Sequence, residues 1–160
     1  MAQDIFLKIN GIDGESMDAA HKNEIEVLNW SWQVLQDSNM HQGSGGGSGK
    51  ATVKDLQFVH NVDRSSPNLM KFCLTGKHIP EAQLTVRKAG GNPLEYLKIT
   101  MTDVVITNVQ PSGSSLDESL KENVSLAFAK IKQEYTVQNQ QGGSGGAVTA
   151  GYDIKLNKEA

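Results

Sequence analysis

The sequence predicts a mainly β fold of antiparallel strands with one short α-helix. Apolar and polar residues alternate in about seven segments, which is the period of half-buried strands. Most connections between these segments are short, and short connections favour antiparallel pairing. Only one segment, following Ser65, has the apolar spacing and the boundary residues of a helix. Since no repeat or domain boundary is visible, the 160 residues are expected to form a single domain, 1–160.

The clearest predicted strand covers residues 24–35. Successive side chains leave a strand on opposite faces, so this segment has an apolar face (Leu28, Trp30, Trp32, Val34) and a polar face (Asn29, Ser31, Gln33). We predict that the tryptophans belong to the core. The polar face is small and uncharged, which fits a solvated sheet face or, in a ring, the lining of a channel. The other strands are expected over residues 4–9, 52–62, 82–88, 94–109 and 122–137, and from Val148 to Leu156.

Two of these strands are long, and their apolar positions change phase. In the segment 94–109 the change falls near Asp103, and in the segment 122–137 it falls between Phe128 and Ile131. A change of phase within one strand predicts a bulge, or a bend that carries the strand from one sheet into another.

The one helix is predicted after Ser65. Pro67 stands where the first helical turn would be, and Gly76 follows the apolar run as a stop signal. Cys73 falls within this run, and a small packed side chain is the favoured interpretation for it. As the only cysteine of the chain, it has no internal disulfide partner.

A glycine-rich connection spans residues 37–50. It ends in Gly49-Lys50, which resembles the end of a phosphate-binding loop. That motif needs a hydroxyl residue after the lysine and a glycine five positions before the second glycine, but Ala51 and Ser44 occupy these positions. No helix pattern follows to organise backbone amides around a phosphate. A long loop with a contact function is therefore favoured over a nucleotide site.

The remaining chemistry-bearing residues form no recognisable catalytic or metal motif. His60 is in phase with its apolar neighbours on segment 52–62 and is expected in the core or in an interface, while His21 and His78 are expected in loops. No two of the four histidines have metal-ligand spacing, and Asp117 and Glu118 fall in a polar loop. We expect no enzyme activity, no cofactor and no metal.

Composition excludes further classes of function. The net charge of −3 and the pI near 5.8 give no basic footprint for nucleic acid. No apolar run is long enough to cross a bilayer, and the start Met1-Ala-Gln-Asp lacks the pattern of a secretory signal. The protein is expected to be made in the cytoplasm, and any export would use a route without a signal peptide.

An ordered series of short segments resembles the haemolysin-coregulated protein (Hcp) family, the tube subunit of type VI secretion. The series covers nearly the whole chain, and its specificity lies in the order rather than in any one piece. The matching segments are Met1-Ala-Gln-Asp-Ile-Phe-Leu-Lys-Ile9, Gly14-Glu-Ser16, Glu26-Val-Leu-Asn-Trp-Ser-Trp32, Gly45-Gly-Gly-Ser-Gly-Lys50, Ser66-Pro-Asn-Leu69, Thr75-Gly-Lys-His78, Arg87-Lys-Ala-Gly-Gly91, Glu95-Tyr96 and Ala150-Gly-Tyr-Asp-Ile-Lys155.

The resemblance implies an antiparallel two-sheet β-barrel with one short helix, similar to phage tail-tube proteins. Such subunits form hexameric rings that stack into a tube inside a contractile sheath, beneath a VgrG-type spike. Contraction expels the tube, secreting it with effectors held in its lumen. Because the sequence stops at Ala160, only the tube module is expected, without a toxin domain.

Two surfaces follow as candidate sites. The resemblance places the strand bearing Asn29, Ser31 and Gln33 in the sheet that lines the channel, so these residues are expected to face the lumen and its cargo. The loop Ser38–Lys50 is expected to make contacts within or between rings, because ordering a glycine-rich segment costs entropy that a contact must offset. The residues of that loop singled out for these contacts are Met40, His41, Gly45, Gly46, Gly47 and Lys50.

Two other functions stay open at this point. The first is a ring-shaped chaperone for small effectors, in which stacking is incidental. The second is an enzyme that depends on Lys50 or Cys73, a hypothesis for which the sequence gives no motif.

Overall fold

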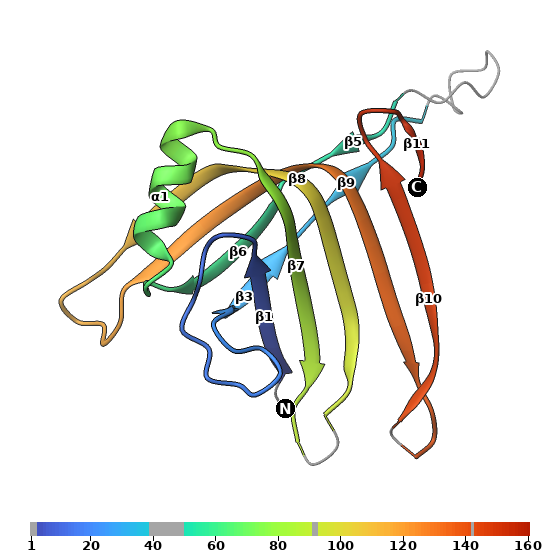
Figure 1. The fold of residues 1–160 in the computed structure, drawn as a ribbon, viewed down its shortest axis with the longest axis horizontal. Coiled ribbons are helices and arrows are strands. Elements are labelled where there is room, and N and C mark those ends of the chain that lie inside the picture. Colours follow the sequence, from blue (N-terminus) through green and yellow to red (C-terminus); the bar gives the residue numbers. More distant parts are fainter. Residues whose placement is uncertain (1–2, 39–49, 91–92, 142) are drawn as a thin grey trace.

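The computed structural model describes residues 3–38, 50–90, 93–141 and 143–160, and within them it contains eleven strands and one helix (Figure 1). In chain order these are β1 (Gln3–Ile9), β2 (Ile25–Glu26), β3 (Asn29–Ser31), β4 (Val34–Leu35), β5 (Thr52–Val53), β6 (Leu56–Asn61), α1 (Ser66–Thr75), β7 (Ile79–Lys88), β8 (Glu95–Ser112), β9 (Lys121–Gln138), β10 (Ser144–Asp153) and β11 (Lys158–Glu159).

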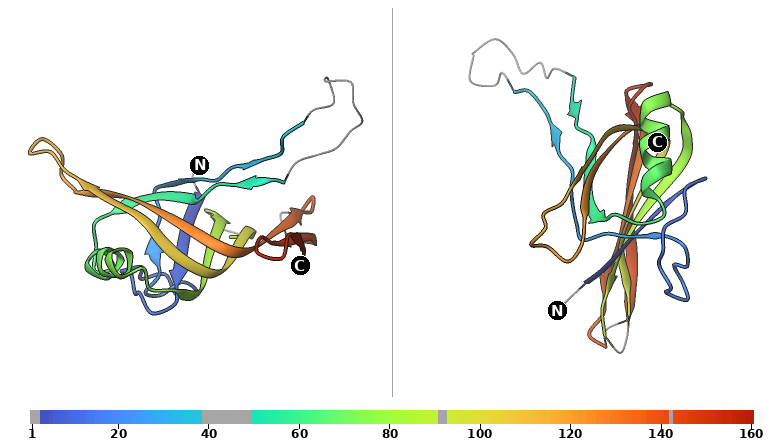
Figure 2. Two further views of the ribbon diagram at one scale, coloured as in Figure 1. Left: turned by 90° about the horizontal axis from the view of Figure 1, so that it is seen from above. Right: turned by 90° about the vertical axis from the view of Figure 1, so that its left-hand side faces the viewer.

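One nine-stranded antiparallel sheet carries the fold. Its path runs β11-β10-β9-β8-β7-β1-β2, and a branch joins β3 to β6 and β6 to β9. The strands β8 and β9 are 18 residues long each and run through both parts of the sheet. The part with β1, β7 and β10 is called the broad wing, and the part with β3 and β6 is called the narrow wing. A separate two-stranded ribbon, β4–β5, projects away from the sheet (Figure 2).

The two long strands bend where the sequence changes phase, which confirms that prediction. Asp103 has a left-handed φ of 56°, and the buried side chains Met101 and Val104 lie on either side of it. A register shift then follows between Ile106 and Asn108, which is a bulge opposite β9. Because β8 and β9 bend together, they carry one continuous ladder from the broad wing into the narrow wing.

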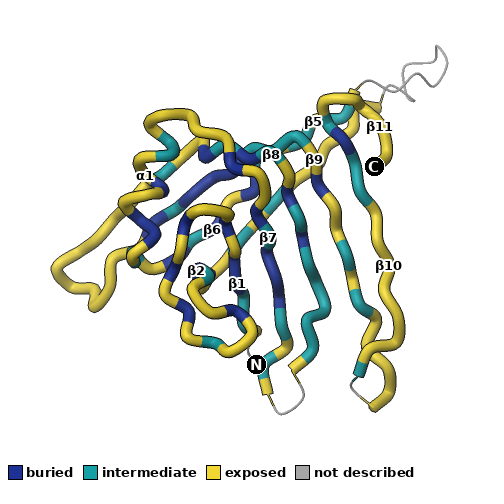
Figure 3. Tube along the Cα trace, in the orientation of Figure 1, coloured by how far each residue is buried: buried dark blue, intermediate teal, exposed yellow. Residues whose placement is uncertain are grey.

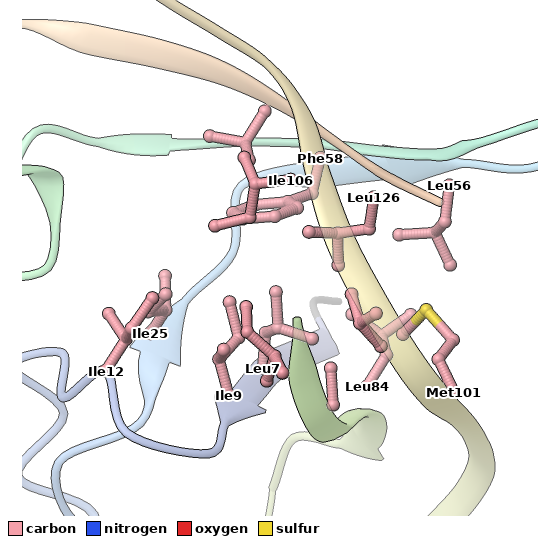
Figure 4. Close-up of a cluster of buried hydrophobic side chains, with 14 of the residues drawn as sticks. Leu7, Ile9, Ile12, Ile25, Leu56, Phe58, Leu84, Met101, Ile106 and Leu126 are labelled. Atoms are coloured by element: carbon pink, nitrogen blue, oxygen red, sulfur yellow. The ribbon is translucent and has the colours of Figure 1, made fainter. Parts of the chain in front are cut away.

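The hydrophobic core lies between the two wings (Figure 4). Broad-wing side chains such as Leu7, Leu84 and Met101 face narrow-wing side chains such as Phe58 and Leu126, and all five are fully buried. Side chains of both wings therefore leave water in one cluster, and this burial is the main force that holds the wings together. Burial falls away toward β10, whose residues from Ser144 to Ala150 are exposed (Figure 3).

The expectation of a closed two-sheet barrel is not met by the single chain. Within the described residues, the path ends at β2 on one side and at β10–β11 on the other, and no ladder joins these ends. β11 pairs only with Tyr152 and Asp153, so the rest of β10 has an open edge. The similarity to phage tail-tube proteins stays a prediction.

The predicted strand 24–35 is broken into three pieces because the chain changes wings within it. β2 pairs with β1, whereas β3 pairs with β6. Between them, the amide of Val27 donates to the Ile5 carbonyl and the amide of Leu28 donates to the Val59 carbonyl. The tryptophans Trp30 and Trp32 pack against the core but are only partly buried.

Other details of the strands also differ from the sequence prediction. Leu28 and Val34, expected to point inward with the tryptophans, are about half exposed. The predicted strand 52–62 is divided into β5 and β6. The last strand ends at Asp153, and residues 154–157 form a turn instead of continuing the strand to Leu156.

The helix α1 is confirmed at both ends. Pro67 lies in its first turn, and Gly76 ends it with a left-handed φ of 64°. The amide of Gly76 donates to the Cys73 carbonyl and the amide of Lys77 donates to the Phe72 carbonyl, so the last turn is capped. Leu69, Phe72 and Cys73 turn toward the core.

The core makes a direct prediction for stability. Leu126→Ala removes a fully buried side chain at the junction of the wings and is expected to lower the free energy of unfolding by about 2–5 kcal/mol, through lost burial and a residual cavity. Chemical denaturation measures the change. Leu116→Ala is the matched control, since that leucine is 92% exposed and its loss should stay within about 0.5 kcal/mol. Equal effects of the two changes would contradict this assignment of the core.

Candidate functional site

The predicted polar face is present on the narrow wing. Asn29 and Ser31 lie in β3 and Gln33 follows it, and all three are exposed. Trp30, between them, packs on the core side. The alternation read from the sequence is therefore confirmed for β3.

Cross-strand register extends this face over four strands. Ser31 pairs with Gln57 on β6, Gln57 with Ser125 on β9, and Ser125 with Asn108 on β8. A second row starts at Asn29 and crosses Val59. Since paired residues point to the same side of a sheet, these positions share one face. The polar residues of these two rows are uncharged, whereas the next row of the face contains Lys121. We call the uncharged residues of the two rows the polar band: Asn29, Ser31, Gln57, Asn108, Gln110, Asn123 and Ser125.

A shallow concavity of about 560 Å³ lies at one end of the polar band. It is lined by Ser31, Trp32, Gln33, Lys54, Asp55 and Gln57. Asn29 does not line this hollow. The hollow has no enclosed, desolvated interior, and its polar groups suit transient hydrogen bonding to a large solute rather than capture of a small one.

Of the predicted contact loop, only the ends can be placed. Lys50 is exposed and precedes β5. Met40, His41, Gly45, Gly46 and Gly47 lie outside the described residues. The β4–β5 ribbon at the base of the loop pairs Val34 with Val53 and Leu35 with Thr52, and it leaves both Val34 and Leu35 about half exposed.

His60 is a core histidine, as expected, but its partners could not be predicted. Its side chain is fully buried, with Nε2 at 2.8 Å from Glu122 Oε1. Its Nδ1 has no hydrogen-bond partner and lies 3.8 Å from Asp63 Oδ2. Glu122 lies 62 residues away and is brought opposite His60 by the β6–β9 ladder. The group links the start of α1 to the narrow wing.

A second group around His21 fastens the loop between β1 and β2 onto the broad wing. The imidazole stacks on Phe6 with ring centroids 4.3 Å apart, and its nitrogens lie 2.9 Å from Glu24 Oε1 and 2.7 Å from Glu95 Oε2. Arg87 packs over the same Phe6 ring. His21 does lie in a loop, as predicted, but it is buried there. Sequence spacing gave no sign of its partner on β8.

Ionic contacts of Arg87 and His21 lower the pKa values of two carboxylates, those of Asp18 and Glu95. Arg87 donates to Asp18 at 2.6 Å and to Asp4 at 2.9 Å. The hydrogen bond from Arg87, followed by one from the Ala20 amide, lowers the pKa of Asp18 to about 2. Both carboxylates raise the pKa of Arg87. Burial opposes ionisation of Glu95, but its hydrogen bond with His21 and the nearby charges outweigh burial and lower the pKa of Glu95.

The bend carries a third ionic group. The carboxylate of Asp103 lies 2.6 Å from His78 Nδ1 and 3.3 Å from Lys155 Nζ. The hydrogen bond with His78, and then that with Lys155, lowers the pKa of Asp103. His78 is in the predicted loop, before β7, and this contact ties the end of α1 to the bend and to the turn after β10.

Other candidate chemistries find no support in the described part of the chain. Cys73 is partly buried beside the core, and no group of three or more His, Cys, Asp or Glu side chains there is arranged to hold a metal ion. No described helix is long and apolar enough to cross a membrane. The geometry thus offers two structural features on which a function can rest: a neutral polar sheet face, and a large exposed strand edge at β10.

Comparison with known proteins gives the family. The sequence profile of the family described as "Type VI secretion system effector, Hcp" matches residues 6–135. This chain belongs to the Hcp family. It is 48% identical over 162 residues to Protein hcp1 of Pseudomonas aeruginosa, covering 100% of both chains. The family assignment makes it a structural protein of the type VI secretion system, with the mainly β fold described above.

Solved Hcp structures share the fold. Hcp1 from Salmonella typhimurium is 58% identical, with a TM-score of 0.85 over 100% of both chains. A type VI secretion system effector from Yersinia pestis is 44% identical, with a TM-score of 0.78 over 94% of this chain and 100% of the other. A type six secretion system protein at 28% identity reaches a TM-score of 0.94, over 99% of this chain and 100% of that one.

The ion pairs predict how the stability of the fold decreases at acidic pH. The pKa of Asp18 in the folded protein lies near 2, below its ordinary 3.8. The ionised Asp18 therefore stabilises the fold at pH values above its ordinary pKa, and this stabilisation is lost as pH falls through the folded pKa. Arg87→Gln removes the main cause of the shift. We expect the urea midpoint of this variant to fall less than that of wild type between about pH 6 and about pH 2.5.

The control for this prediction is Lys22→Gln, which removes an exposed cation from the β1–β2 loop that also carries Asp18. It should retain the wild-type fall in midpoint at acidic pH. If Arg87→Gln and wild type lose the same stability over this range, the Asp18–Arg87 ion pair does not determine the loss of stability at acidic pH.

Proposed function

We propose that this protein is the structural subunit of the inner tube of a type VI secretion system. In this role it forms hexameric rings that stack into a tube, the tube is expelled by a contractile sheath, and effectors travel in its lumen. The observation that carries the proposal is the polar band, because a conduit for varied cargo needs a wall that neither binds tightly nor repels. Family membership supports the system to which the tube belongs.

The polar band, together with Gln33 in the hollow at its end, supports a lumen position for Asn29, Ser31 and Gln33. Neutral side chains make hydrogen bonds that are individually weak in water. They also set up no long-range field that would select cargo by charge. The band spans four strands whose other face is core, so its side can meet solvent, cargo or a neighbour, and in a ring this side faces inward.

The open edge of β10 and the exposed ribbon support assembly. Unpaired strand edges invite association with other chains, and the exposed part of β10 is such an edge. A ring of identical subunits removes edges by heterologous contacts that close on themselves. The loop Ser38–Lys50, at the end of the β4–β5 ribbon, contacts neighbouring subunits or rings in this proposal, through Met40, His41, Gly45, Gly46, Gly47 and Lys50.

The proposed partners follow from the tube. They are further copies of the chain, a VgrG-type spike at the tip, the contractile sheath and effector proteins in the lumen; neither nucleic acid nor membrane insertion is part of the role. The protein is made in the cytoplasm without a signal peptide, and it reaches the extracellular space or a target cell when the sheath contracts.

Ring formation is tested on the purified full chain. Light scattering after gel filtration is expected to give the mass of a hexamer, and electron microscopy is expected to show six-fold rings. The open β10 edge and the exposed apolar side chains are the physical reason for association. A monomeric mass at micromolar concentration would contradict the proposal.

Ser31→Arg tests the lumen. The substitution places a long cation in the polar band. Cargo in contact with it removes water from the guanidinium, and each polar group that is left without a partner costs roughly 1–3 kcal/mol. We expect intact rings with less co-purified effector, measured by quantitative mass spectrometry at equal ring yield; an acidic effector could gain.

The control is Ser115→Arg, which adds the same charge at an exposed serine of the β8–β9 turn, outside the polar band and the hollow beside Ser31. It should leave effector retention unchanged. No difference between Ser31→Arg and wild type across several effectors would remove Ser31 from the cargo surface.

A further inference from the structure

A buried histidine and two carboxylates connect the narrow wing to the start of α1. We propose that these three residues, His60, Glu122 and Asp63, form a pH-sensitive switch. With one additional proton the three residues hold the first turn of α1 in place, and loss of that proton loosens it. We call them the His60 group. The switch is a property of the single chain and does not depend on the proposed ring.

The geometry around the imidazole gives each of its nitrogens a carboxylate. His60 is fully buried, and its Nε2 lies 2.8 Å from Oε1 of Glu122, which is 3% exposed. Its Nδ1 lies 3.8 Å from Oδ2 of Asp63 and has no hydrogen-bond partner among the described residues. An ionised carboxylate can only accept hydrogen bonds, whereas a neutral imidazole has one donor and one acceptor nitrogen. The neutral imidazole therefore cannot donate to both carboxylates.

The acceptor nitrogen of the neutral imidazole meets a second acceptor. With Nε2 donating to Glu122, the lone pair of Nδ1 lies beside Asp63 Oδ2 without a proton between them, and a buried polar group left in this way is destabilising. One additional proton removes the conflict, because Nδ1–H then faces the Asp63 carboxylate. The count is the same if the proton of the Nε2 contact is placed on Glu122, since His60 and Glu122 titrate as one coupled pair.

The surroundings of the His60 group are acidic. Glu15 and Glu26 line a small hollow together with Asp63, on the side away from α1. Negative charges near an imidazole favour its protonated form, while burial opposes it. With a carboxylate at each nitrogen and two more beside Asp63, the charges favour the additional proton.

No basic side chain of the described residues competes with the imidazole for these carboxylates. Arg64 and Lys71 are exposed and form no ion pair within the described part of the chain. Lys121 pairs with Asn61 one position along the ladder, so it lies on the opposite face of the sheet. The half of β8 beside the group, residues 104–112, contains no charged residue. The protonated His60 is therefore the cation at the centre of the group.

Asp63 connects the group to the first turn of α1. Its Oδ1 accepts a hydrogen bond from the Ser65 amide at 2.8 Å and one from the Ser65 hydroxyl, and its own amide donates to the Ser66 hydroxyl at 3.1 Å. Ser65 precedes the helix, and its side chain forms no capping hydrogen bond with the helix amides. The first turn therefore takes its position from Asp63, and a shift of Asp63 away from His60 moves it.

The helix has few other contacts that would fix its start. Within α1 the buried residues are Ser66 and Leu69. Segments with little buried apolar surface open locally at a lower free energy than the core. Asp63, Ser66 and Glu122 also line an apolar groove of about 620 Å³ beside α1. The state of the His60 group thus affects one wall of this groove as well as the helix.

The additional proton gives the sign of the pH dependence. Its contribution is present where the His60–Glu122 pair holds the proton, and it is lost as pH rises through the titration of that pair. Hydrogen–deuterium exchange of the full chain, followed by mass spectrometry and corrected for the intrinsic exchange rate, measures the opening of α1. Between about pH 6 and about pH 9, we expect the protection of the amides of residues 65–70 to fall at least about tenfold.

Asp63→Asn is the variant that separates a switch from a merely structural contact. The asparagine keeps an oxygen for Ser65 and places an N–H group where Oδ2 faces Nδ1, so the neutral imidazole gains a donor. We expect the start of α1 in this variant to keep its protection over the same pH range. Asp117→Asn, the same change at an exposed aspartate, and His78→Gln, which removes an exposed histidine beyond the other end of α1, should both show the wild-type fall.

Nitrogen NMR of the wild-type chain with isotope-labelled histidine tests the protonation itself, with His60 assigned by variants that lack the other histidines. His60 Nδ1 should carry a proton at the acid end of the range and lose it where the protection falls. Light scattering at each pH ensures that samples of equal mass are compared, so dissociation of the proposed ring is not counted as opening of α1. An Nδ1 without a proton throughout, constant protection in wild type, or an equal fall in Asp63→Asn would overturn the switch and leave the ring untouched.

Discussion

The ladder between β8 and β9 is the feature on which both wings depend. Each strand has 18 residues, and their pairing continues from Leu97 to Ser112. The early half of β8 takes β7 on its other side, and the early half of β9 takes β6. Bending this one ladder at Asp103 turns the same face of the sheet in both wings inward, and the core forms between the two wings.

The bend is stabilised by polar contacts as well as by burial. A non-glycine residue in the left-handed region of φ/ψ space carries a conformational cost. The side-chain contacts of Asp103 with His78 and Lys155 offset this cost. These contacts come from the segment after α1 and from the turn after β10. Asp103 thus connects the segment after the helix, the bend and the far edge of the sheet.

The fold leaves an open strand edge and exposed apolar side chains on the periphery. The core is complete between the wings, yet β10 is exposed along most of its length and apolar side chains of α1 remain in solvent. Three ionic groups, around His21, His60 and Asp103, fasten the loops and the helix so that these surfaces keep a fixed shape. For the proposed ring, a rigid subunit loses less conformational entropy at each contact than a flexible one would.

Local pattern in the sequence determined the strand-rich fold, the helix from Ser66 to Thr75, the phase change at Asp103 and the opposite faces of Ser31 and Trp30, because these depend on side-chain period and on the caps beside each element. Tertiary structure alone decided the division of segment 24–35 and the end of the last strand, because hydrogen-bond partners on other strands set where each ladder starts and stops. It also decided the polar band beyond Ser31 and the pairing of His21 with Glu95, since register and contacts between residues 74 positions apart leave no trace in local spacing.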